Sequence, residues 1–124
     1  PASGRIIAKF GRQWNSKLKT TTENPGIDIK GQPGSAIKTV LGGVVTTITY
    51  IRGYGTTIII DHGGGFYTVY SHVANIQAAV DSEVRNGDII AYMGDSGSIN
   101  GSKLHFEIWG KGQKLDPEKW LRKK

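Results

Sequence analysis

Apolar and β-branched residues recur along the chain in short runs that glycine, proline or asparagine turns separate. Each run has the length of a β-strand. The runs cover residues 5–10, 26–30, 42–51, 56–62, 66–72, 88–93 and 104–109. Antiparallel neighbours are favoured because the connections between the runs are too short to carry crossover helices. The pattern predicts an all-β fold, an antiparallel β-sheet or sandwich.

Residues 116–121 read as one short C-terminal helical turn. Asp116 suits the N-cap of this turn, and Pro117 suits its first helical position. Trp120 lies in the turn and is expected to pin the C-terminus to the sheet, and Trp14 is also expected to be structural. No repeat or internal linker interrupts the chain, so we expect a single domain over residues 1–124, with residues 1–4 as a linker or a cloning remnant.

Composition and charge limit the possible metal ligands and partners. The chain has 124 residues, eighteen of them glycine, and no cysteine. A metal site would therefore need histidine and carboxylate ligands. The formal net charge of +6 favours an anionic partner, such as an acidic protein surface or cell-wall polymer, but no basic helix or RNA-binding aromatic motif favours nucleic acid. No run is long enough to be a transmembrane segment, and the first residues lack a signal-peptide pattern.

A hairpin is predicted over residues 52–72, with its turn at Gly63–Gly65. His62 is expected to be a turn or surface histidine. His72 ends the second strand where a loop begins, so it is the better candidate for a functional site. Residues 80–94 resemble a segment of lipoyl and biotinyl carrier domains, but the lysine-containing tripeptide that carries their cofactor is absent, which argues against a carrier.

Three segments together resemble a known family. They are GIDIKGQPGSAIKTVLGGVV (26–45), DHGGGFYTVYSHV (61–73) and VRNGDIIAYMGDSGSINGSKLHFEIWGKGQKLDPEKWL (84–121). In order, spacing and turn chemistry they are similar to the LytM or lysostaphin-type zinc peptidases, which cut peptide bonds in peptidoglycan. The resemblance covers roughly residues 5–121 and implies a LytM-type β fold.

The resemblance also implies a site. In active members, zinc is held by the histidine and aspartate of an H-x-x-x-D motif and by the second histidine of an H-x-H motif, which leaves a position for water. Asp28 and His105 match two of these ligands, and His72 matches a catalytic histidine. Asn24 stands in place of the third ligand, and Lys103 in place of the second catalytic histidine.

Both replacements argue against catalysis. An amide oxygen is a poor zinc ligand beside imidazole, so Asp28 and His105 remain as remnant ligands, one short of the usual three. A lysine ammonium near 4 Å from a dication would repel it by roughly 8 kcal/mol at an effective dielectric of 20. We therefore expect no cofactor and no catalytic residue, with Lys103 pairing with Asp28 in place of the metal. His72 swinging in as a third ligand is the alternative.

Degenerate domains of this type include the EnvC-type murein hydrolase activators, which bind N-acetylmuramoyl-L-alanine amidases. The leading hypothesis is therefore a non-catalytic regulator of a cell-wall amidase, in the periplasm or cell envelope. The expected interface is the former active-site groove, formed by Asn24, Asp28, His72, Lys103 and His105, with residues 95–102 as a mobile rim.

Two alternatives remain open from the sequence. A peptidoglycan-binding module would use the positive charge and aromatic residues such as Tyr54, Tyr67 and Trp109. A zinc-dependent peptidoglycan endopeptidase would need unorthodox ligands around Asp28 and His105.

Overall fold

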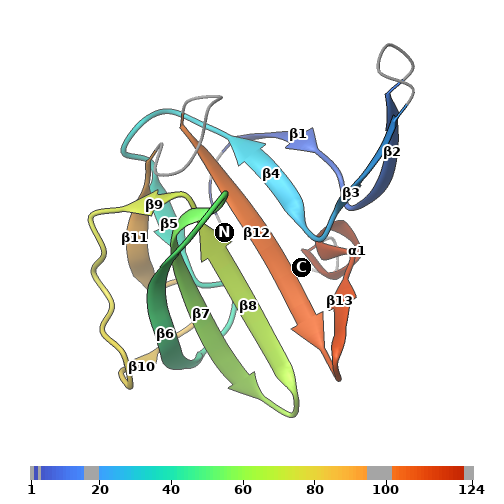
Figure 1. The fold of residues 1–124 in the computed structure, drawn as a ribbon. Coiled ribbons are helices and arrows are strands. Elements are labelled where there is room, and N and C mark those ends of the chain that lie inside the picture. Colours follow the sequence, from blue (N-terminus) through green and yellow to red (C-terminus); the bar gives the residue numbers. More distant parts are fainter. Residues whose placement is uncertain (1, 3, 16–19, 95–101, 122–124) are drawn as a thin grey trace.

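The computed structural model describes residues 2, 4–15, 20–94 and 102–121, and the side chains of residues 12–15 and 20–22 are left out of this description (Figure 1). The elements follow in the order β1 (Arg5–Ala8), β2 (Gly11–Asn15), β3 (Thr20–Asn24), β4 (Ile27–Lys30), β5 (Ala36–Lys38), β6 (Gly43–Ile51), β7 (Gly55–Gly63), β8 (Phe66–Ser71), β9 (Val73–Ala74), β10 (Glu83–Val84), β11 (Ile89–Met93), β12 (Lys103–Gly110), β13 (Gln113–Leu115) and α1 (Pro117–Leu121).

The large sheet is organised around β12. Its strands follow the spatial order β1-β4-β12-β8-β7-β6-β10, and β13 also pairs with β12. The first half of β12 pairs with β4, its second half pairs with β13, and β8 lies along the opposite edge. All of these pairs are antiparallel, as expected. Strand β12 therefore has neighbours on both edges and is a rigid place for functional side chains.

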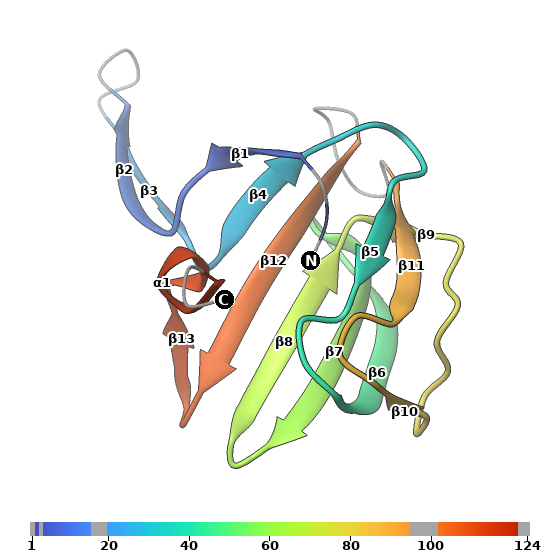
Figure 2. The same ribbon diagram turned by 180° about the vertical axis from the view of Figure 1, so that it is seen from behind.

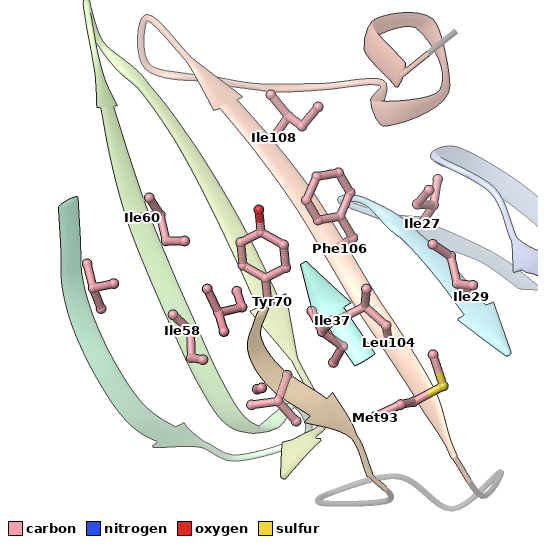
Figure 3. Packing of buried hydrophobic residues seen from close by; sticks show 14 residues of the cluster. Ile27, Ile29, Ile37, Ile58, Ile60, Tyr70, Met93, Leu104, Phe106 and Ile108 are labelled. Carbon is pink, nitrogen blue, oxygen red and sulfur yellow. The ribbon is translucent and has the colours of Figure 1, made fainter. Parts of the chain in front are cut away.

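A smaller sheet, β5-β11-β9, packs against one face of the large sheet (Figure 2). Ile37 of β5 and Met93 of β11 meet Tyr70 of β8 and Phe106 of β12 in the core between the two sheets (Figure 3). These four side chains are at most 2% exposed. The β2–β3 hairpin extends away from both sheets.

The strand prediction is confirmed for all of the apolar runs, each of which forms a strand within one or two residues of the expected bounds. Gly63, Gly64 and Gly65 have φ values of 85°, 64° and 85°, so the turn of the predicted hairpin needs glycine. Helix α1 begins after Asp116, whose Oδ1 accepts a hydrogen bond from the Glu118 N–H at 3.1 Å. The sequence analysis did not identify strands β2, β3, β5, β9, β10 and β13.

The two ends of the described chain pack onto the sheets. The Trp120 ring of α1 lies 5.5 Å from the Phe66 ring of β8, so the helix does rest on the sheet. Ala2 contacts the core, and a Cβ atom at Gly4 would lie 2.3 Å from the Lys30 carbonyl oxygen. Helix α1 is too short to cross a membrane, and no described helix qualifies as a membrane span. The side chain of Trp14 lies outside the described part of the chain.

The inter-sheet core predicts a contrast between two isoleucines. Ile58→Ala, at a fully buried position, should lower the free energy of unfolding by about 2–5 kcal/mol because it leaves a cavity. Ile89→Ala, at a position that is 43% exposed, should cost less than about 1 kcal/mol. Urea unfolding followed by circular dichroism measures both values, and equal losses would contradict this assignment of the core.

Candidate functional site

One face of β12 carries a stripe of polar side chains. Leu104, Phe106 and Ile108 point into the core (Figure 3). Because side chains alternate along a strand, Lys103, His105, Glu107 and Trp109 lie on the opposite face. We call this side of the large sheet the polar face.

Asp28 meets two cationic side chains of this stripe. It lies directly opposite His105 in the β4–β12 pair. The His105 Nδ1 lies 2.5 Å from Asp28 Oδ1, and the Lys103 Nζ lies 3.3 Å from Asp28 Oδ2. The Asp28 and Lys103 side chains are only 16% and 13% exposed, so solvent screens this ion pair weakly. The pairing expected between Lys103 and Asp28 is thus present.

Glu107 contacts the other nitrogen of the His105 ring. Its Oε2 lies 2.8 Å from His105 Nε2, and its Oε1 accepts a hydrogen bond of 2.7 Å from the Trp109 indole N–H. Ionised carboxylates only accept hydrogen bonds. We therefore infer that both ring nitrogens of His105 carry protons, so that the ring is an imidazolium between two carboxylates. Removing one partner from such a buried arrangement costs about 3–5 kcal/mol.

Tyr54 covers His105 from the turn between β6 and β7. The two rings lie 4.8 Å apart, and the Tyr54 ring is 6.3 Å from that of His72. The backbone N–H of His72 donates to the Tyr54 carbonyl at 2.9 Å, which ties the turn to the end of β8. His72 has a φ of 63°, unusual for a residue with a side chain, and is 3% exposed. The Tyr54 ring therefore covers one side of the site.

The charges of this cluster shift each other's pKa values. Burial lowers the pKa of His105, but the hydrogen bonds and charges of Asp28 and Glu107 outweigh it, so the pKa is raised. Burial raises the pKa of both carboxyl groups, but His105 outweighs it, helped by Lys103 at Asp28 and by Trp109 and Lys114 at Glu107, so both are lowered. The pKa of Tyr54 is raised by burial and by both carboxylates.

The donor set does not fit a zinc ion. Asn24, at the position of the missing ligand, uses its Oδ1 to accept the Gly26 N–H at 3.1 Å in a local turn. The two ring nitrogens of His105 face the carboxylates of Asp28 and Glu107, and the Lys103 ammonium lies beside the Asp28 carboxylate. In the described part of the chain, no three His, Cys, Asp or Glu side chains are placed to hold a metal ion.

The structure brings together part of the predicted groove. Asp28, Lys103 and His105 are in direct contact, and Tyr54 links them to His72. Asn24 instead lines a hollow of about 470 Å³ with Phe10, Gly11, Glu23, Pro25 and Lys114. Most of the expected rim, residues 95–101, lies outside the described residues.

The structure gives His62 and Glu107 different roles. His62 bonds to the Gly42 carbonyl at 2.8 Å and to Thr68 Oγ1 at 2.7 Å, so its role is structural. Glu107 was not identified as a site residue from the sequence. The signal that indicates it is the alternation in KLHFEIW, which places Glu107 on the same strand face as His105.

An aromatic pair lies farther along the polar face. Tyr67 of β8 is directly opposite Trp109 of β12, and their rings are 6.4 Å apart. With Gln113 and Lys114 of β13 and the turn residues Gly65 and Gly112, they line a hollow of about 240 Å³. Lys114 Nζ also lies 5.8 Å from the Trp109 ring centre. The polar face therefore combines a charged cluster with an aromatic surface suited to binding.

Comparisons with known proteins agree with this description. The profile of peptidase family M23 matches residues 22–117. Three relatives each align with 98% of this chain. The outer membrane antigenic lipoprotein B of Haemophilus influenzae is 43% identical, and the murein hydrolase activators NlpD and EnvC of Escherichia coli are 37% and 31% identical. The aligned region is only 28–30% of the length of these relatives.

The fold also matches that of solved proteins. The structure of LytU superposes with a TM-score of 0.84 at 29% sequence identity, over 98% of this chain and 86% of that protein. The likeness therefore extends across nearly all of both chains, including the all-β architecture.

The His105 cluster predicts a characteristic pH dependence of stability. Because the pKa of His105 is raised on folding, its contribution is complete below about pH 6.5 and is lost as pH rises through the raised value. The lowered pKa values of Asp28 and Glu107 give a contribution that is present above about pH 4.5 and is lost as pH falls through them. The cluster should therefore stabilise the fold most between these limits.

Urea unfolding of the wild type and of His105→Gln across this pH range tests the prediction. The difference in unfolding free energy between the two proteins should shrink as the pH rises through the raised pKa of His105. A difference in unfolding free energy that stays constant from about pH 5 to about pH 9 would contradict the imidazolium assignment.

The donor set also predicts the response to zinc. After equilibration with zinc and removal of the excess, elemental analysis should find far less than one zinc ion per wild-type chain. Asn24→His combined with Lys103→His should bind about one, since it restores three ligands and removes the ammonium. Retention of one zinc ion by the wild type, lost in Asp28→Asn, would contradict the account of the site.

Proposed function

This chain belongs to peptidase family M23, and we propose that it is a non-catalytic member that regulates peptidoglycan remodelling by activating a cell-wall amidase. Its working surface is the polar face, which replaces the former active-site groove. The proposal rests above all on the Lys103–Asp28–His105–Glu107 cluster, in which side chains of the protein itself supply the positive charge that zinc supplies in a peptidase.

The cluster also lacks the reactive groups that hydrolysis requires. The Lys103 side chain lies beside Asp28, where its charge would repel a dication, and both nitrogens of the His105 ring already face carboxylates. A water molecule at this site would therefore have no Lewis acid to activate it, and neither ring nitrogen of His105 is free to take its proton. Binding is the function that these charges support.

Relatives named as murein hydrolase activators support the choice of a regulatory role. The names of these relatives and of the lipoprotein also support a place in the cell envelope, and we propose the periplasm. The aromatic pair Tyr67 and Trp109 gives the polar face a partly buried apolar surface of the kind that carries binding energy in protein interfaces. The same pair keeps a peptidoglycan-binding module as the second candidate.

An activation assay separates these functions. The purified chain, mixed with a peptidoglycan amidase from the same organism, should accelerate the release of dye from labelled cell walls, and the chain alone should release none. Trp109→Ala should reduce activation about tenfold or more, as expected for an aromatic residue central to an interface.

Trp120→Ala is the matched control, because Trp120 packs on Phe66, which alternates with Tyr67 along β8 and so lies on the other face of the sheet. This variant should leave activation unchanged. Release of dye by the chain alone would favour the peptidase. Pelleting with cell walls, without any effect on the amidase, would favour the binding module.

A further inference from the structure

Three cationic residues lie side by side across one end of the polar face. Arg5 of β1 is directly opposite Lys30 of β4, and Lys30 is directly opposite Lys103 of β12. Residues that are directly opposite each other in antiparallel strands share a face, and Lys30 shares the face of Asp28 by alternation. The three side chains thus form a row on the polar face, which we call the cationic row.

The sheet does not gain stability from this arrangement. Neighbouring strands are roughly 4.8 Å apart, and like charges at directly opposite positions destabilise a sheet. Lys103 is balanced by Asp28. Among the described residues no ion pair involves Arg5 or Lys30, and both residues are exposed. Within the described residues, the row therefore presents two positive charges without an ion-pair partner beside the site.

A hollow of about 460 Å³ adjoins these two charges. It is lined by Gly4, Arg5, Lys30, Gly31, Gln32 and Ser35, none of which is acidic. Polar side chains, backbone groups and two cations suit a carboxylate. Ile7 lies two residues from Arg5 along β1, at the irregularity opposite Asp28, and is 41% exposed. Such a branched apolar side chain matches a polypeptide better than the hydroxyl-rich surface of a glycan.

We propose that the cationic row binds an acidic segment of the protein partner, with carboxylates on Arg5 and Lys30. This inference rests on the proposed function, because it assigns a chemistry to the partner that the polar face engages. The same segment would place apolar side chains toward Tyr67 and Trp109, since the aromatic pair lies toward the opposite end of β12 from Lys103. Charge at one end and aromatic surface at the other give the bound segment a direction.

A direct binding experiment tests the row without an amidase. The probe is a glutamate hexapeptide, titrated at low salt into the ¹⁵N-labelled chain, with a glutamine hexapeptide as the neutral control. Amide shifts should cluster at residues 4–6, 29–31 and 102–104. Arg5→Glu with Lys30→Glu should weaken binding about tenfold or more, while the neutral peptide causes no shifts.

The matched control reverses the charge of one arginine and one lysine elsewhere on the surface. Arg85→Glu with Lys38→Glu changes the net charge by the same amount, and both positions are exposed and outside the polar face. This variant should weaken binding less than about twofold. Equal losses in the two double variants would overturn the proposal, because they would show attraction to net charge alone.

Other results separate the possible ligands. Soluble peptidoglycan fragments that shift residues of the row, when the glutamate hexapeptide does not, would also overturn the proposal. If the peptide fails to bind while the chain activates an amidase, the cationic row is wrong and the proposed function stands. If the peptide binds at the row but no amidase is activated, the cationic row stands and the proposed function is wrong. Circular dichroism and urea unfolding confirm that both double variants are folded.

Discussion

The His105 ring, held between the carboxylates of Asp28 and Glu107, is the interaction on which the rest of the site depends. Two carboxylates on neighbouring positions of one sheet face repel each other unless a positive charge lies between them. In a zinc peptidase the metal contributes that charge. Here His105 lies between the carboxylates, and Lys103 adds a second cation at Asp28. Side chains of the protein thereby supply positive charge between these two carboxylates.

The core fixes the geometry of this cluster. Leu104 and Phe106 of β12 are completely buried, so the strand cannot shift by one residue without exposing them. The alternation that buries them also places Lys103, His105 and Glu107 on the polar face. Pairing with β4 then sets Asp28 directly opposite His105. The arrangement of charges is therefore a consequence of packing on the other side of the same sheet.

Much of this structure was predictable from the chain. Apolar runs bounded by glycine turns identify the strands of the large sheet, and the Asp116–Pro117 pair identifies the start of the helix. The strands that were not identified are short or rich in threonine and charge, as in TTTEN of β3. Several of them pair with strands far along the chain, as β5 does with β11 and β10 with β6. Local patterns carry little information about such pairing.

The candidate site was predictable only in part, for a related reason. The replacements Asn24 and Lys103 are visible in the motifs, and they indicate a site without the usual ligands. The local turn of Asn24, and the bonds of Glu107 to His105 and Trp109, depend on three-dimensional contacts. The alignment of Arg5, Lys30 and Lys103 depends on the register of three strands and has no counterpart in the linear sequence.

Nuclear magnetic resonance of the His105 ring nitrogens tests the central claim most directly. A pH titration of the ¹⁵N-labelled chain, with and without zinc, would follow the protonation of this one side chain. The account predicts that both nitrogens keep their protons to a higher pH than in a free histidine, and that zinc does not change the midpoint. A midpoint at or below that of free histidine, with a further shift of the ring signals on addition of zinc, would contradict it.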